Sequence, residues 1–242
     1  MESGDILYPT WALGKWTAVS TLSSVLAPAG EDLFSPGRNG TEALRRARLE
    51  VGQPLEYAVR WREADGPGAA TSVVVDREYN TASISRATMG PNAVQNTQAD
   101  GPDRLSLVLR PDGAPASSLY RADLRVVQRR TDPYPLAERP NFFACAETTR
   151  QTVVVVAGDK ASGPRSGPLI KEIDTICTYE LDASDPKIMR GYQRTATFLV
   201  PDAAYTGDPS LVELAASRLA RAPNGRLVAS DVRVYELVYR RA

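Results

Sequence analysis

The strongest constraint on the fold is a series of segments in which apolar and polar residues alternate. Leu55–Arg62 alternates cleanly, and Arg104–Arg110 and Tyr120–Val126 repeat the pattern. A period of two is typical of antiparallel strands that bury one face. No helical pattern of ordinary length separates successive strands, which argues against parallel sheets built from strand–helix–strand units.

Six further strands are expected, and they bring the total to nine or ten. They are Gly14–Leu26, Ser72–Tyr79 (continued by Asn80–Thr88), Phe142–Val156, Ile170–Leu181, Tyr192–Val200 and Arg226–Arg240. Two short helices are expected at Thr41–Leu49, with Thr41 as its N-cap, and at Pro209–Ala220, and Gly90–Pro102 is expected to be a polar loop. The sequence therefore predicts a single all-β domain over residues 1–242, an antiparallel barrel preceded by a tail of residues 1–8. The long first and last strands favour closure of the barrel, which removes exposed sheet edges.

Composition excludes several classes of chemistry. The chain has no histidine, so Ser-His-Asp and Cys-His catalysis and histidine-ligated zinc are excluded. Two cysteines cannot form a four-cysteine metal site, and we expect neither a metal nor another cofactor. Lys+Arg and Asp+Glu both number 29, so no nucleic-acid partner is expected. No apolar stretch is long enough to span a membrane.

A short motif at the start of the first strand carries a resemblance. Gly14-Lys15-Trp16 matches the G-x-W signature of the lipocalin superfamily, in which a basic residue of the last strand covers the tryptophan. Arg240 or Arg241 is the candidate for that cation–π contact. More of the chain resembles a lipocalin-like domain family of cyanobacteria and of algal and plant chloroplasts. The matching segments are Pro9–Trp11, Gly14–Thr17, Ala27–Gly30, Asp76–Thr81, Glu147 with Arg150-Gln151, Gln193–Leu199 and Tyr239-Arg240.

The resemblance implies a lipocalin-like barrel and a location in the chloroplast, within it the thylakoid lumen. Two features depart from it. Ala29 stands where a bulkier apolar residue is expected, and Met1–Tyr8 resembles neither a signal nor a transit peptide. The protein is then either cytosolic, or Met1 lies near a mature N-terminus.

An apolar interior would suit a lipid, a pigment or an isoprenoid. The pattern does not distinguish a hollow barrel from one filled by its own side chains. Residues expected to point inward and to contact a ligand are Tyr57, Val59, Trp61, Leu107, Tyr120 and Phe198.

Three groups of residues could carry chemistry or structure. On the expected strand Ser72–Tyr79, Asp76 and Glu78 share one face, and Tyr79 lies on the other. The two carboxylates could act as acid and base without histidine; alternatively they face water while Tyr79 packs inward and Arg77 pairs with a carboxylate. A second group could form a salt bridge at one end of the barrel or bind a ligand carboxylate, and it comprises Glu147, Arg150, Gln151, Gln193 and Arg194.

The third group is the cysteine pair. If Phe142–Val156 and Ile170–Leu181 form a hairpin, Cys145 and Cys177 lie nearly opposite each other. Either a disulfide or two reduced thiols fits this placement, depending on the compartment.

The expected function is non-catalytic: binding of a small apolar ligand, or an auxiliary role with a photosynthetic complex. Two alternatives stay open. One is a lipocalin-type enzyme with isomerase or epoxide chemistry that uses Asp76, Glu78 or Tyr79. The other is a solid barrel that acts as a protein-interaction module.

Overall fold

Ten antiparallel strands and three α-helices make up the computed structural model, which describes residues 4–35, 39–64, 72–115, 118–132, 138–157, 169–198, 209–220 and 228–242. The strands are β1 (Gly14–Leu26), β2 (Pro54–Glu63), β3 (Val73–Val75), β4 (Val94–Asp100), β5 (Arg104–Leu109), β6 (Leu119–Thr131), β7 (Phe142–Ala157), β8 (Leu169–Leu181), β9 (Ile188–Phe198) and β10 (Ala229–Arg241). The helices are α1 (Gly40–Leu49), α2 (Arg77–Met89) and α3 (Pro209–Ala220), with short 3-10 turns η1 (Thr10–Ala12) and η2 (Glu31–Leu33).

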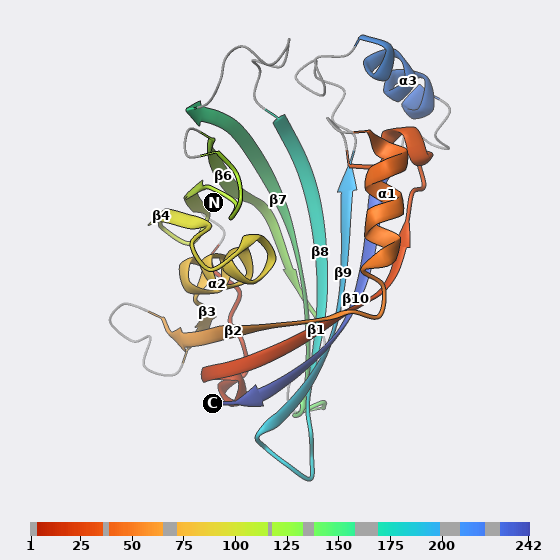
Figure 1. Cartoon of the computed structure of the whole chain (residues 1–242). Helices are drawn as coiled ribbons and strands as arrows, with labels where there is room; N and C mark the ends of the chain where they lie inside the picture. The colour runs from red at the N-terminus through yellow and green to blue at the C-terminus, as the bar shows by residue number, and fades with distance from the viewer. Residues whose placement is uncertain are drawn as a thin grey trace.

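The strands form one curled sheet in the order β3-β2-β1-β10-β9-β8-β7-β6-β5-β4. Figure 1 shows this sheet as a half-barrel. The expected all-β barrel with short helices is confirmed, and the first strand pairs with the last, Val19 lying opposite Val238. The sheet does not close by hydrogen bonding within the described residues, because β3 and β4 are its edges and α2 packs between them against β2 and β4.

Two expectations of secondary structure were wrong. The expected strand Ser72–Tyr79 ends at Val75, and its predicted continuation is helix α2. The side chain of Asp76 accepts a hydrogen bond from the backbone N–H of Tyr79 at 3.0 Å and so begins the helix. The expected loop Gly90–Pro102 contains β4, whose polar side chains suit an edge that faces water.

The two expected helices are present. The structure confirms α3 at its predicted bounds, whereas α1 starts one residue earlier than expected and is capped by Asn39 instead of Thr41. Asn39 accepts from the backbone N–H of Glu42 at 3.2 Å. Residues 158–168, which join the expected strands Phe142–Val156 and Ile170–Leu181, lie outside the described residues, as do Leu199-Val200 and Arg226-Leu227.

One end of the concave face is filled by aromatic side chains. Trp61 lies edge-on to Tyr8, Tyr179 and Tyr239, with ring centroids 5.8–5.9 Å apart. Gly191 leaves room for the Tyr239 ring, since a Cβ at this position would lie 2.9 Å from Cε2 of that ring. This end of the half-barrel is therefore solid core.

Trp16 lies at the same end, and the structure shows which of the two candidate arginines covers its ring. The guanidinium carbon of Arg241 lies 4.3 Å from the ring centroid of Trp16, whereas Arg240 is exposed and pairs with Thr17 in the sheet. Arg241 also donates to the backbone oxygens of Leu13 at 2.7 Å and Trp11 at 2.8 Å. The cover is Arg241, and a covering role for Arg240 was wrong.

We expect Arg241→Ala to lower the free energy of unfolding by about 2 kcal/mol, since it loses a cation–π contact and two charge-assisted hydrogen bonds. Arg240→Ala serves as the matched control and should change it by less than about 0.5 kcal/mol. Urea denaturation of both variants measures the difference. Equal effects would contradict the assignment of Arg241 as the cover.

Candidate functional site

A network of partly buried charges lies on the concave face beside the aromatic end. Arg77, in the first turn of α2, donates to both carboxylate oxygens of Glu147 on β7, at 2.9 and 2.5 Å. Arg129 on β6 donates to the same carboxylate at 3.0 Å, and its side chain is only 5% exposed. Asp5 accepts from Arg77 at 3.0 Å. Four side chains therefore meet here, one each from α2, β6, β7 and the N-terminal segment. We call Asp5, Arg77, Arg129 and Glu147 the charge network.

The charge network keeps its carboxylate ionised. Burial alone would raise the pKa of Glu147, but hydrogen bonds and positive charge from Arg77, and then from Arg129, outweigh burial and lower it. Burial would likewise lower the pKa of Arg77, but the carboxylates of Glu147 and Asp5 raise it above its ordinary value. Glu147 is therefore an anion at neutral pH and cannot donate a proton.

The first pocket beside the network has a volume of about 870 Å³ and lies at the open seam of the sheet, between the edges β3 and β4 and against α2. We call it the seam pocket. Its polar lining consists of Asp5, Arg60, Arg62, Asp76, Arg77, Glu78, Tyr79, Arg86 and Thr97, and its apolar lining includes Val74, Val75, Ala82 and Ala99. The sequence-predicted catalytic candidates Asp76, Glu78 and Tyr79 thus all reach one pocket, though from a helix and not from a strand.

Each of these three candidates is engaged by a neighbour. Asp76 caps α2 and accepts from Arg60 at 2.5 and 2.7 Å. Glu78 accepts from the hydroxyl of Thr97 on β4 at 2.6 Å. The Tyr79 ring lies under the guanidinium of Arg60, 4.6 Å from its centroid. The expectation that Asp76 and Glu78 share one face of a strand was wrong, because the Asp76 cap turns the chain into a helix.

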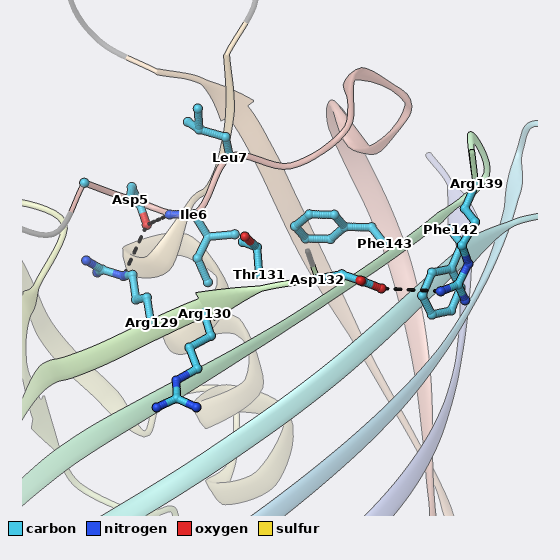
Figure 2. A pocket seen from close by; sticks show the side chains of 11 residues that line it. Asp5, Ile6, Leu7, Arg129, Arg130, Thr131, Asp132, Arg139, Phe142 and Phe143 are labelled. Atoms are coloured by element: carbon cyan, nitrogen blue, oxygen red, sulfur yellow. Dashed lines mark hydrogen bonds and ion pairs between the residues drawn. The ribbon is translucent and has the colours of Figure 1, made fainter. Parts of the chain in front are cut away.

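A second pocket, of about 410 Å³, is lined by the N-terminal segment and by residues of β6 and β7. Figure 2 shows Asp5 directed toward Arg129 on β6, and Arg139 directed toward Asp132. The guanidinium carbon of Arg139 also lies 3.8 Å from the ring centroid of Phe142. The two pockets share Asp5, so both border the N-terminal segment.

Residues 4–8 are not a free tail, contrary to expectation. Ile6 is buried, and the backbone N–H of Tyr8 donates to the oxygen of Val73 at 2.8 Å. The Tyr8 hydroxyl lies 3.7 Å from the sulfur of Cys145. This segment, which we call the strap, crosses from β3 to the concave faces of β6 and β7.

Cys145 and Cys177 lie directly opposite each other in the β7–β8 register, as the hairpin predicted. Both are free thiols in this structure. The Cys177 sulfur donates to the Gln193 side-chain oxygen at 3.8 Å, so Gln193 reaches the thiol pair from β9.

The remaining predicted residues divide between the two faces of the sheet. Five of the six predicted ligand contacts lie on the concave face: Tyr57, Val59, Trp61, Leu107 and Tyr120. On β2, Tyr57 lies opposite Ala18, Val59 opposite Trp16 and Trp61 opposite Gly14. Leu107 lies opposite Ala122, and Tyr120 opposite Val155. Phe198 was predicted to face inward but lies opposite Glu172, on the convex face. The expected grouping of Arg150 and Arg194 with Glu147 was also wrong, because β8 separates β7 from β9. Arg150 pairs with Glu172 at 2.5 Å, and Arg194 lies opposite Ile176 on the convex face.

The sequence did not identify Arg129 or Asp5 as members of the charge network. A bulge between Val126 and Gln128 shifts the alternation of β6 and turns Arg129 inward, and no local pattern reports such a bulge. Asp5 precedes the first strand, where nothing indicates a long-range partner. For helix α2, which carries Arg77 into the charge network, the sequence did contain a signal. Asp76 is a good N-cap residue, and Glu78 is an acidic residue in the first turn.

Among the described residues, no three or more Cys, Asp or Glu side chains are grouped so that they could hold a metal ion. Nor does any helix in the described part of the chain combine the length and apolar character needed to cross a membrane.

Comparison with known proteins gave one result. Searches of curated proteins and of solved structures produced no match. The model of the family described as a domain of unknown function, DUF6816, matches residues 1–222. Because this match covers most of the chain, the protein belongs to the DUF6816 family.

Proposed function

We propose that this protein binds, without chemical conversion, a small organic ligand that has an apolar body and an anionic group. The observation that carries the proposal is the seam pocket. Its volume of about 870 Å³ falls within the range of small-molecule sites, roughly 300–1,000 Å³. The sequence predicted an apolar ligand. The arginines that line this pocket indicate that the ligand also carries an acidic group.

The charge of the pocket supports an anionic ligand. Four guanidinium groups line it, against the three carboxylates of Asp5, Asp76 and Glu78. The N-terminus of α2, with its positive end of the helix dipole, also opens here. The Arg86 side chain has no hydrogen bond or ion pair to any described residue, so its guanidinium is available to a carboxylate or phosphate.

Binding is favoured over catalysis by the contacts of the acidic side chains. A general acid or base needs a carboxyl group that is free to exchange a proton with substrate. Asp76 is held by Arg60 and by its own helix, and Glu78 by Thr97. These contacts suit groups that shape a pocket and hold arginines in place.

The experiment compares palmitate with methyl palmitate by isothermal titration calorimetry. Palmitate should bind at least about tenfold more tightly, because only the acid can accept charge-assisted hydrogen bonds from arginine. Arg86→Gln should weaken palmitate binding about 5- to 20-fold and leave the ester unchanged. Equal affinity for acid and ester, or no binding of either, would contradict the proposal.

The matched control is Arg125→Gln, which removes an exposed arginine on β6 outside the seam pocket. Palmitate affinity should stay within about twofold of the wild-type value. Mass spectrometry of organic extracts from natively purified protein would then identify the physiological ligand.

The cellular setting is part of the same proposal. A location in the chloroplast, within the thylakoid lumen, and an auxiliary role with a photosynthetic complex rest on the resemblance carried by Gly14-Lys15-Trp16 and the other matching segments.

A further inference from the structure

The two cysteines lie on the concave face, outside the charge network and the seam pocket. They come from adjacent antiparallel strands and are direct partners in register. Partners of this kind have Cα atoms about 4.5–5.5 Å apart. This separation lies inside the range found for disulfides, about 4.4–6.8 Å.

The surroundings favour reaction between the two sulfurs. Cys145 is buried, with 7% of its surface exposed, whereas Cys177 is half-buried and packs against the aromatic core cluster. The pKa of the Cys145 thiol is lowered, first by a hydrogen bond from Cys177 and, against the effect of burial, by the Tyr8 hydroxyl and the charge of Arg77. The pKa of Cys177 is raised well above its ordinary value, first through its hydrogen bond to Cys145 and then through burial. The pair thus has one thiolate-prone sulfur and one sulfur that keeps its proton.

We propose that Cys145 and Cys177 form an intramolecular dithiol–disulfide exchange site that reacts with a low-molecular-weight disulfide. A thiolate of the pair attacks one sulfur of the small disulfide, and the first small thiol leaves. The second cysteine then attacks the mixed disulfide, forms the Cys145–Cys177 bond and releases the second small thiol. Overall the two protein thiols are oxidised, and one small disulfide is reduced to two thiols that carry the two protons.

This site goes beyond ligand binding and does not depend on it. The thiol pair does not line the seam pocket. A negative result with palmitate would therefore leave the thiol proposal unaffected, and the converse also holds.

The test treats the native protein with oxidised glutathione, then unfolds it and alkylates the remaining thiols with N-ethylmaleimide. Wild-type protein should lose both reactive thiols, become lighter by about 2 Da and carry no glutathione, because the second cysteine displaces it. Dithiothreitol should restore both thiols. A peptide map should join the segments that contain Cys145 and Cys177.

The single variants Cys145→Ser and Cys177→Ser should instead retain a bound glutathione wherever the remaining thiol reacts, since no partner thiol can release it. A comparison that needs no variant is the rate of ring closure in native and in urea-unfolded wild-type protein. Preorganised sulfurs should close at least about 100-fold faster in the native state. A stable glutathione adduct on the wild type, two thiols left free, or closure no faster than in urea would overturn the proposal.

Discussion

Trp61→Ala is expected to lower the free energy of unfolding by about 3–5 kcal/mol, the cost of removing a buried aromatic side chain from a packed core. Trp61 is 3% exposed and contacts three tyrosine rings from β8, β10 and the strap. Its loss would leave a cavity where the strap meets the sheet. Urea denaturation followed by circular dichroism measures the effect.

Two further variants separate packing from other contributions. Tyr192→Ala removes an aromatic ring on β9 that is 46% exposed and should cost less than about 1 kcal/mol. Trp61→Phe keeps a ring in the cluster and gives up no hydrogen bond, since the indole N–H has no partner in the described part of the chain. It should therefore cost clearly less than the alanine variant. Similar losses in Trp61→Ala and Tyr192→Ala would show that the aromatic end is not the core of the fold.

The second large effect is expected from Glu147→Gln, which removes the anion held by Arg77 and Arg129, whose side chains are 19% and 5% exposed. Arg129 and Arg77 would keep their charges and lose the carboxylate they share, while Asp103 stays paired with Arg129 and Asp5 with Arg77. Breaking a buried ion pair from one side costs about 3–5 kcal/mol, because the remaining charge is left uncompensated. The loss should appear in the free energy of unfolding at neutral pH.

The pH dependence follows from the direction of the Glu147 pKa. This pKa is lower in the folded protein than in the unfolded chain, where glutamate titrates near about 4.3. The ion network is thus fully stabilising above that unfolded value, and its contribution is lost as the pH falls through the folded pKa. The difference between wild type and Glu147→Gln should be full at neutral pH and should shrink in acid.

Glu172→Gln is the matched control, one strand away. Its partner Arg150 is 53% exposed, so this pair is screened by solvent and should contribute at most about 1 kcal/mol. If both variants lost the same stability, or if the Glu147 difference persisted in strong acid, the charge network would not be the stabilising feature described here.

The sequence predicted those parts of the fold that depend on alternation and on hairpin symmetry. Strands such as β2 and β7, and the opposition of Cys145 and Cys177, follow from local pattern and from a turn between two strands. Helix α2 was mistaken for a strand because its only buried residue is Ala82, so it shows no apolar stripe. Here the cap at Asp76 outweighed the pattern of the residues that follow.

The candidate site was only partly predictable, for a different reason. Asp76, Glu78 and Tyr79 were identified by their residue types, and they do line the seam pocket. The charge network could not be assembled from the sequence, because Asp5, Arg77 and Glu147 are far apart in the chain and meet only in the folded sheet. Pairings of this kind depend on strand order and register, which no local pattern reports.

The position of β10 has a consequence for synthesis. This strand is made after the other nine described strands, yet it lies between β1 and β9 and joins β3-β2-β1 to the rest of the sheet. While the chain is still on the ribosome, β1 and β9 each expose a long row of unpaired backbone groups. Pairing β1 with β10 also closes a loop of nearly the whole chain, and such non-local contacts form slowly. A nascent chain stalled before residue 229 should therefore be a substrate for chaperones that bind exposed strand edges, and this need should end once β10 is inserted.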